Sequence, residues 1–187
     1  RKDPERVLVM EHAAKVKAAL EAAGVRVKLD TRDDVSPGYK FNDWEMRGVP
    51  VRVEIGPRDV EGDAVVLGRR DVPGKDGKQF GIPAARVGDA VRNLLVEIQA
   101  GLLRQATEFR DANTRSVSSY DDFRQLIDGD GGFIRVHWAG SDEDEDTIKE
   151  ETKATIRCFP EDADEGEGVC FYTGKKTTQV AIFARAY

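Results

Sequence analysis

The stretch SPGYKFNDWEMRGVPVRVEIGPRD, residues 36–59, places a helix, a strand and a turn in close succession. Its opening Ser-Pro pair is typical of a helix N-cap followed by proline at the first helical position, and Gly48 is expected to end that helix. Valine and isoleucine then alternate with charged residues, which predicts a strand over 50–55. A Gly-Pro pair breaks the strand, and Arg58 and Asp59 follow it.

The predicted strand has one polar face, formed by Arg52 and Glu54. Carboxylates and guanidinium groups of this kind can read guanine, and an unstacked base can lie on an aromatic ring such as Phe41 or Trp44. The alternative is a solvated sheet face with surface ion pairs, next to two aromatic residues that belong to a core. From spacing alone, the solvated face is the more common explanation.

Similar patterns outside this stretch predict a first part of class α/β with a mixed sheet and a second part that is a small α+β unit. The polar segment 113–119 marks the expected boundary, which gives domains at 1–115 and 116–187. In the first part we expect helices over 3–23 and 83–112, strands over 25–29 and 64–69, and a turn at 74–78. In the second part we expect helices over 120–127 and 142–151, strands over 133–138 and 155–159, and a closing hairpin that pairs 169–172 with 179–184.

Charge divides the chain in the same way. The net charge is −6 overall, but residues 1–116 carry +2 and residues 117–187 carry −8. A strongly acidic surface suits a protein that must stay dispersed in salt, and it equally suits an ordinary acidic accessory domain. No apolar run is long enough for a membrane span. Cys158 and Cys170 in such a charged chain fit a reducing cytoplasm better than a disulfide framework.

The sequence shows no clear metal or nucleophile motif. Cys158, Cys170, His12 and His137 have no close metal-ligand spacing, so each is expected to be structural, with Cys158 in the core. GxSxG and Gly-rich phosphate loops are absent. A small thiol or metal enzyme is therefore the poorest of the functional hypotheses.

The words of the sequence carry a family resemblance. SPGxKFxxWExxGVPxRxEIGPRD, then RRD, LLVEIQAGLL and ATEFRD, closely resemble the anticodon-binding domain of prolyl-tRNA synthetase of the archaeal and eukaryotic-like type. GGFIRVHWAG, IKEETKATIRC and the ending FARAY resemble the zinc-binding-like C-terminal domain of that family. The resemblance implies a class II anticodon-binding domain followed by a small α+β domain, from an ATP- and Mg²⁺-dependent ligase whose catalytic domain lies upstream. It also implies proline tRNA as partner and a homodimer in the whole enzyme.

The resemblance assigns roles to individual residues. Proline anticodons share guanines at their second and third positions. Glu45 is expected to accept hydrogen bonds from one guanine, and Arg58, where many members have lysine, to donate to the other. Asp59 is expected to hold Arg58, and Phe41 and Arg52 to stack on bases. Lys40, Arg69 and Arg70 are weaker candidates for phosphate contacts.

Two further expectations concern the ends of the family pattern. The four zinc-ligand positions of the relatives read Ala139, Asp144, Cys170 and Thr173, so no zinc is expected. Tyr187 stands where relatives place a terminal carboxylate near the catalytic site. The strand that precedes the first helix in the family has no counterpart here, so we expect a segment of a longer protein. The alternative function is an acidic module that braces a larger enzyme without touching a base.

Overall fold

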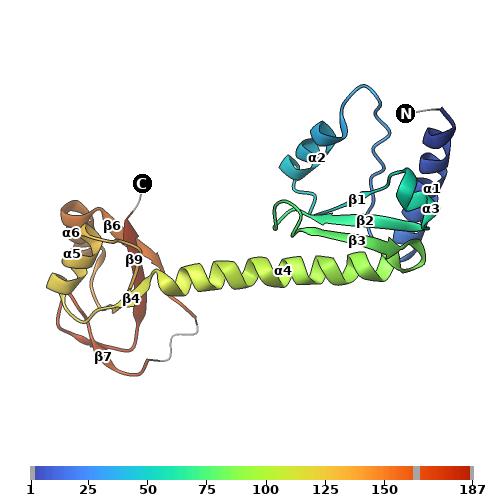
Figure 1. The fold of residues 1–187 in the computed structure, drawn as a ribbon. Coiled ribbons are helices and arrows are strands. Elements are labelled where there is room, and N and C mark those ends of the chain that lie inside the picture. Colours follow the sequence, from blue (N-terminus) through green and yellow to red (C-terminus); the bar gives the residue numbers. More distant parts are fainter. Residues whose placement is uncertain (1–2, 162–164, 186–187) are drawn as a thin grey trace. The chain divides into compact units, whose positions relative to one another are not determined.

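The computed structural model describes residues 3–161 and 165–185 (Figure 1). Its residues fall into two compact units, 1–104 and 105–187. Helix α4 (Val87–Ala112) contributes residues to both. The predicted boundary after residue 115 therefore stays a prediction, although the strand that follows α4 already belongs to the second sheet.

The first unit is an α/β structure around a three-stranded sheet of order β1-β2-β3, with both strand pairs antiparallel. Figure 1 shows α4 along one face of this sheet and α2 on the opposite side. The elements are α1 (Asp3–Ala22), α2 (Pro37–Met46), β1 (Val51–Glu54), α3 (Pro57–Glu61), β2 (Ala64–Arg69), β3 (Lys78–Pro83), the 3₁₀ turn η1 (Ala84–Arg86) and α4.

The strand register sorts the side chains of the sheet onto two faces. Val53 lies opposite Leu67, and Leu67 is fully buried against α1 and α4. Arg52 lies opposite Gly68, which lies opposite Lys78 of β3, so these three residues share the other face. The alternation predicted from the sequence is thus confirmed, and the polar face is the one turned toward α2.

Two predictions for the first unit are wrong. Segment 25–29 alternates in burial as expected, but it forms no strand. A cavity of about 700 Å³ is lined by both this segment and β1, and within the described residues no strand pairing joins the two. Strand β3 was missed, because a β-bulge near Gly81, whose φ is +67°, interrupts its pattern and leaves Phe80 exposed.

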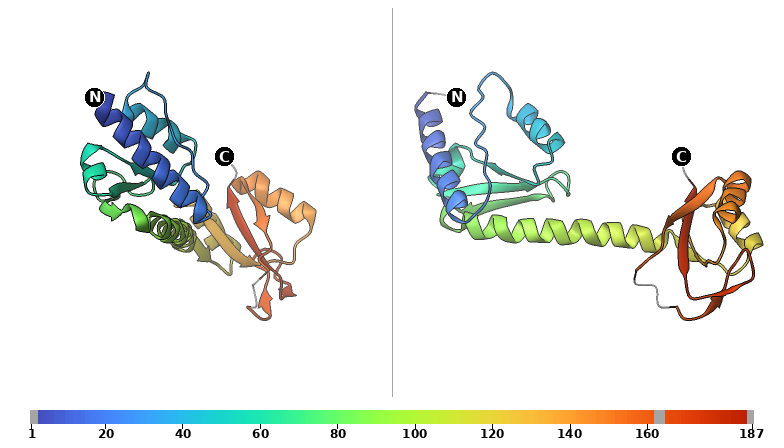
Figure 2. Two further views of the ribbon diagram at one scale, coloured as in Figure 1. Left: turned by 90° about the vertical axis from the view of Figure 1, so that its right-hand side faces the viewer. Right: turned by 180° about the vertical axis from the view of Figure 1, so that it is seen from behind.

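The second unit is an α+β structure whose four-stranded sheet has the order β4-β5-β9-β6. The β4–β5 pair is parallel, while β9 pairs antiparallel with both β5 and β6. Its elements are β4 (Thr114–Ser116), α5 (Tyr120–Asp128), β5 (Phe133–His137), α6 (Asp142–Thr152), β6 (Ala154–Cys158), β7 (Gly168–Val169), β8 (Lys176–Thr177) and β9 (Val180–Arg185). Figure 2 shows this unit from two further sides.

The expected closing hairpin is wrong in its pairing. Strand β7 pairs with the short β8, whereas β9 lies in the centre of the sheet. A central position suits the sequence of β9, because Val180, Ala181, Phe183 and Ala184 are all buried. Its near-continuous apolar run is the mark of a strand covered on both sides.

Aromatic residues dominate the core of the second unit. Phe123 and Phe183 are fully buried and meet edge to face at 5.5 Å, and Trp138 and Phe171 pack against them. Of the core predicted from the sequence, Ile134, Val136, Trp138, Phe171 and Phe183 are buried, while Ile156 and Ile182 are half-buried. Cys158 was expected in the core and is exposed, because the register of β6 shifts between Ile156 and Cys158.

No helix within 3–161 and 165–185 is both long enough and apolar enough to cross a membrane.

Candidate nucleic-acid interface

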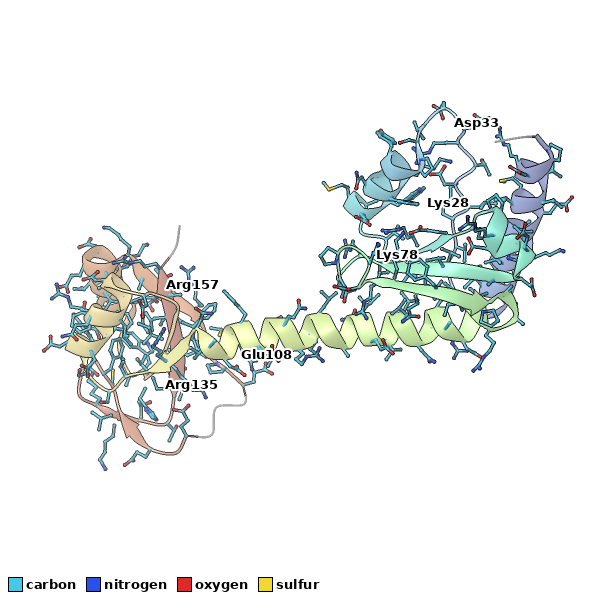
Figure 3. The ribbon with its side chains drawn as sticks, viewed as in Figure 1. Lys28, Asp33, Lys78, Glu108, Arg135 and Arg157 are labelled. Atoms are coloured by element: carbon cyan, nitrogen blue, oxygen red, sulfur yellow. The ribbon has the colours of Figure 1, made fainter. Side chains whose placement is uncertain are left out.

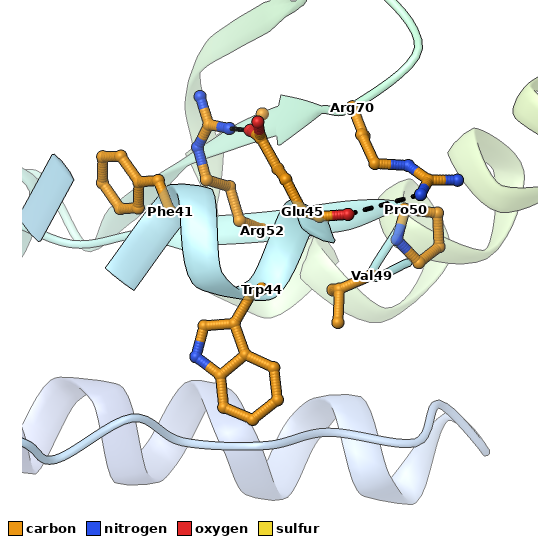
Figure 4. A pocket seen from close by; sticks show the side chains of 8 residues that line it. Phe41, Trp44, Glu45, Val49, Pro50, Arg52 and Arg70 are labelled. Carbon is orange, nitrogen blue, oxygen red and sulfur yellow. Dashed lines mark hydrogen bonds and ion pairs between the residues drawn. The ribbon is translucent and has the colours of Figure 1, made fainter. Parts of the chain in front are cut away.

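Helix α2 carries the first predicted site residues. Its first turn is capped by Ser36, whose hydroxyl accepts from the Tyr39 N–H at 3.2 Å. Phe41 and Glu45 lie four residues apart and therefore share a face of the helix. In Figure 4, Trp44 projects from the opposite side of α2. The two aromatic residues thus have different surroundings, and Phe41 is the one beside Glu45.

Trp44 fastens α2 to the extended segment before it. Its indole N–H donates to the Asp30 carboxylate at 2.9 Å. The same carboxylate accepts from the Arg32 side chain at 2.6 to 3.2 Å, and Arg32 also reaches Asp43 at 2.9 Å. The hydrogen bonds from Arg32 hold the pKa of Asp30 well below its ordinary value. Figure 3 shows this segment near Asp33 with its side chains.

Arg52 is held from several directions. Its Nε donates to Glu54 at 2.8 Å, and Nη1 donates to Glu45. The guanidinium carbon lies 4.6 Å from the centre of the Phe41 ring, which is a cation–π contact. Beneath it, Gly68 has no side chain, and a Cβ there would lie 3.0 Å from Arg52 Nε. Arg52 and Phe41, both predicted as stacking partners, therefore stack on each other.

Glu45 keeps hydrogen-bonding capacity. Its side chain is 37% exposed, and only Oε1 is engaged by Arg52 among the described residues. Its backbone carbonyl accepts from Arg70 Nη1 at 3.4 Å. Figure 4 shows the hollow around it, which is lined by Phe41, Trp44, Glu45, Val49, Pro50, Arg52, Gly68 and Arg70. A free carboxylate oxygen beside a stacked aromatic pair can accept from a flat, donor-rich ligand.

Arg58 lies at the other end of β1, in the short helix α3. It is exposed, and the described residues offer its guanidinium no hydrogen bond or ion pair. Asp59 does not hold it, contrary to expectation. The Asp59 carboxylate instead accepts from the Gly56 N–H at 2.8 Å and closes the first turn of α3. Asp59 thereby stabilises the turn from which Arg58 projects.

The three candidates for phosphate contacts differ in availability. Lys40 donates to the Arg32 carbonyl and lies 3.9 Å from Asp30. Arg69 forms two hydrogen bonds with Asp71, at 2.8 and 2.6 Å. Arg70 is exposed and has no carboxylate partner within the described part of the chain. Arg70 is therefore the candidate with most capacity left for an anion.

Sequence reasoning undervalued one set of residues on this face. Glu54, set aside as a structural charge, receives both Arg52 and, at 2.8 Å, Lys78 Nζ. Burial would raise the pKa of Glu54, but the hydrogen bonds from Lys78 and Arg52 outweigh it and lower that pKa. Lys78 (Figure 3) and Gly68 were not singled out at all. The signal for Gly68 was a glycine inside a strand, which often marks the close approach of another group.

The four family zinc positions do not form a ligand set. Cys170 is buried, and its sulfur accepts from the Thr173 N–H at 3.4 Å. Burial opposes ionisation of this thiol, but the hydrogen bonds from Thr173 lower its pKa. The Thr173 hydroxyl bonds to the Ala139 carbonyl at 3.4 Å, and Asp144 caps α6 through the Ser141 N–H at 2.9 Å.

The other candidate ligands add nothing to that site. His12 meets the Ala64 carbonyl oxygen at 3.2 Å, in the other unit. Within the described ranges, no group of three or more His, Cys, Asp or Glu side chains could hold a metal ion. The donor set at the family zinc positions is thus a thiol, a capping carboxylate, an engaged hydroxyl and an alanine, which does not fit zinc. Tyr187 lies outside the described residues.

Two family models match this chain. Residues 4–94 match the model described as "Anticodon binding domain", and residues 120–187 match "Prolyl-tRNA synthetase, C-terminal". The site described above lies inside the first match. The hydrogen-bonded turn around Cys170 lies inside the second match.

Individual relatives agree with both models. The chain is 49% identical over 187 residues to a proline–tRNA ligase of Roseiflexus sp., and 50% identical over 190 residues to a chloroplastic/mitochondrial one of Arabidopsis thaliana. It is covered completely in both, but spans only 38% and 35% of those proteins. A crystal structure of prolyl-tRNA synthetase from Cryptosporidium parvum, complexed with L-proline and AMP, matches with a TM-score of 0.81 at 31% identity, over 95% of this chain and 37% of that one. The chain therefore belongs to the prolyl-tRNA synthetase family and corresponds to the C-terminal region of its members.

Proposed function

We propose that this chain is the anticodon-reading region of an ATP-dependent proline–tRNA ligase. It binds proline tRNA and reads the two shared guanines of the anticodon, so that an upstream catalytic domain can attach proline. The observation that carries the proposal is the surface-facing Glu45 carboxylate, with one oxygen fixed by Arg52 and the other open, beside the Phe41 ring.

Glu45 supplies the acceptor for one guanine. The Watson–Crick edge of guanine presents N1–H and N2–H₂ as neighbouring donors, and a carboxylate can accept both. Adenine presents a different pattern there, so the same carboxylate would meet an acceptor. Because Arg52 fixes Oε1, the carboxylate has a defined orientation before the base arrives.

Arg58 supplies donors for the second guanine, through O6 and N7. It follows the end of β1, whereas Glu45 contacts Arg52 near the start of that strand, and four strand residues at about 3.3 Å each span roughly 13 Å. The two groups therefore serve two bases splayed along the strand and not two edges of one base. Asp59 supports this arm by closing the turn below it.

Phe41 gives the stacking surface, and Arg52 supports it by stacking on the Phe41 ring. Base–aromatic stacking contributes about 1 to 3 kcal/mol per base and tolerates any base, so it adds affinity without selecting guanine. Arg70 at the rim is placed to meet a phosphate, whereas Lys40 and Arg69 are largely engaged by Asp30 and Asp71.

The activity of the whole protein extends beyond this chain. ATP and Mg²⁺ would act in the upstream catalytic domain, and we propose that the whole protein is a homodimer. For the second unit we propose a metal-free fold, in which hydrogen bonds of Cys170 and Thr173 close the turn where the family resemblance implies zinc-ligand positions. Its −8 charge is consistent with a role that keeps RNA away from this surface.

The test is a pair of titrations of the full-length protein. One RNA is the proline tRNA transcript and the other has both anticodon guanines replaced. Glu45→Gln keeps the shape of the side chain but removes one acceptor, so we expect discrimination to fall by about 5- to 100-fold. Glu61→Gln, at an exposed position of α3, is the matched charge control and should leave discrimination unchanged.

Equal affinity of the unaltered protein for both RNAs would refute base reading. The competing function, an acidic module that braces a larger enzyme, makes a separate prediction. If proline tRNA protects no amide between residues 36 and 70 from hydrogen exchange, that bracing role is the correct one.

A further inference from the structure

We propose that Gly68, Glu54 and Lys78 form a positioning layer that holds Arg52 flat on the sheet and so aims the Glu45 carboxylate at its base. This inference rests on the proposed function and assigns roles to residues that themselves touch no base. They act through Arg52.

The strand register puts the three residues around one point. Gly68 of β2 lies between Arg52 of β1 and Lys78 of β3 in the same cross-strand row. Glu54 is two residues beyond Arg52 and therefore on the same face. With no side chain at Gly68, Lys78 can reach across β2 to Glu54, and its Nζ lies 2.8 Å from Oε2.

Each oxygen of the Glu54 carboxylate accepts a hydrogen bond from a different side chain. Oε1 accepts from Arg52 Nε at 2.8 Å, and Oε2 accepts from Lys78. Lys78 therefore fixes the rotation of the carboxylate, and the carboxylate fixes the Nε edge of the guanidinium. The opposite edge of the guanidinium is then left to face Glu45 through Nη1.

Packing completes the restraint. The Phe41 ring covers one side of the guanidinium, and Gly68 lies under the other. A Cβ at position 68 would come within 3.0 to 3.2 Å of Arg52 Nε, Cζ and Cγ, so a side chain there would force Arg52 to shift by a few tenths of an ångström. Arg52, Glu54 and Lys78 side chains are only 20 to 24% exposed, which limits competition from water.

The chemistry explains why such a layer matters for reading a base. A flexible arginine could satisfy the Glu45 carboxylate in many orientations, and most would turn the open oxygen away from the ligand. Selective sites need their reading groups held by a supporting shell, because small misplacements weaken hydrogen bonds to the correct ligand. Nonselective affinity, which comes from stacking and phosphates, does not depend on that aim.

The test measures discrimination between proline tRNA and the transcript with both guanines replaced, in the full-length protein. We expect Glu54→Gln to reduce discrimination by about tenfold, and Lys78→Gln and Gly68→Ala by a smaller factor, with affinity for the altered transcript nearly unchanged. Lys78→Arg should retain most of the discrimination that Lys78→Gln loses, because arginine keeps a donor within reach of Glu54. The ¹⁵N signal of Arg52 Nε–H should broaden or shift in Glu54→Gln and Lys78→Gln.

Matched controls change the same residue types elsewhere in the first unit. Glu97→Gln removes a charge that lies 3.9 Å from Arg69, and Lys17→Gln breaks the pair with Glu21 at 2.8 Å. Gly101→Ala adds a methyl group whose nearest neighbour would be 4.0 Å away. None of these three should alter discrimination.

The outcomes separate the two proposals. If Glu45→Gln abolishes discrimination but the Glu54, Lys78 and Gly68 variants do not change it, the positioning layer is refuted and base reading stands. If Glu45→Gln has no effect, base reading itself fails. A uniform loss for both RNAs would show that the layer serves only stability. Lys78 is partly exposed, so Lys78→Gln remains a usable test if a Gly68 variant does not fold.

Discussion

Two polar clusters, one in each unit, show what distinguishes a binding site from a cluster whose hydrogen bonds are all made within the protein. Around Arg52 the hydrogen bonds leave an oxygen of Glu45 open at the surface, and Arg58 projects free within the described residues. In the cluster around Cys170, that residue is only 2% exposed. Its sulfur accepts a hydrogen bond from the Thr173 N–H, and the Thr173 hydroxyl donates to the Ala139 carbonyl. Both clusters were identified from family positions. Only the first keeps capacity for a partner.

The cores differ in the same direction. The second unit is closed around mutually packed aromatic rings, whereas the first has an aliphatic core beside a cavity of about 700 Å³. Dense packing makes each buried ring costly to remove, while the cavity of the first unit leaves the side chains around it room for local adjustment. Stability should therefore be concentrated in the second unit and recognition in the first.

The largest expected effect is Phe123→Ala. Phe123 is fully buried against Phe171 and Phe183, so its truncation should lower the free energy of unfolding of the second unit by about 3 to 5 kcal/mol. Hydrogen exchange should show lost protection within residues 105–187 and retained protection within 1–104. Phe159→Ala, at a position 47% exposed, should cost less than about 0.5 kcal/mol. Equal loss in both units would contradict the division of roles.

Phe41→Ala should have the next largest effect, on binding. Loss of stacking should weaken binding of proline tRNA by about 1 to 3 kcal/mol. With an abasic nucleotide in place of the stacked base, the same substitution should change affinity little, because no base remains to stack. Phe80→Ala, on β3 of the same unit and 64% exposed, is the control. An equal penalty with and without the base would show that Phe41 acts only by supporting Arg52.

Asp30→Asn should destabilise the first unit by about 1 kcal/mol at neutral pH, a modest value because solvent screens the partly exposed pair with Arg32. The pKa of Asp30 is lowered in the folded state, so its contribution is complete above the ordinary value of 3.8 and is lost as pH falls from there through the lowered folded pKa. In urea unfolding between pH 7 and pH 3, the stabilities of the two proteins should therefore differ by a constant amount down to about pH 4 and begin to converge only below it. Asp34→Asn, at an exposed neighbour, should show no such convergence.

The sequence predicted most of the helices because their signals are local. Ser36, Ser119 and Ser141 cap α2, α5 and α6, and all three helices begin at the residues expected from the sequence. Pairing was harder, because it depends on partners distant in the chain. Segment 25–29 has strand-like alternation but pairs with no strand among the described residues, and β9 reads as half of a hairpin although it pairs with β5 and β6.

The site was predicted in its parts and not in its connections. Family words identified Glu45, Arg52 and Arg58, and the structure places the first two in contact. The roles of Gly68 and Lys78 depend on a cross-strand row that brings β1, β2 and β3 together, and β3 was not expected. The expected direct contact between Asp59 and Arg58 is not formed, because the Gly56 N–H, two residues before Arg58, donates to the Asp59 carboxylate instead.

The smallest expected effect concerns the hydrogen-bonded turn around Cys170 in the second unit. Thr173→Val removes the hydroxyl contacts to Ala139 and Lys175, both 3.4 Å long, so it should cost about 0.5 kcal/mol or slightly more. Thr178→Val, at an exposed position in the same unit, should be neutral. A chelator should leave the unfolding temperature of both the variant and the unaltered protein unchanged, since the turn around Cys170 is closed by hydrogen bonds. If the chelator lowered the unfolding temperature of the second unit, a metal would be closing the turn, and the contrast between an open and a self-satisfied cluster would fail.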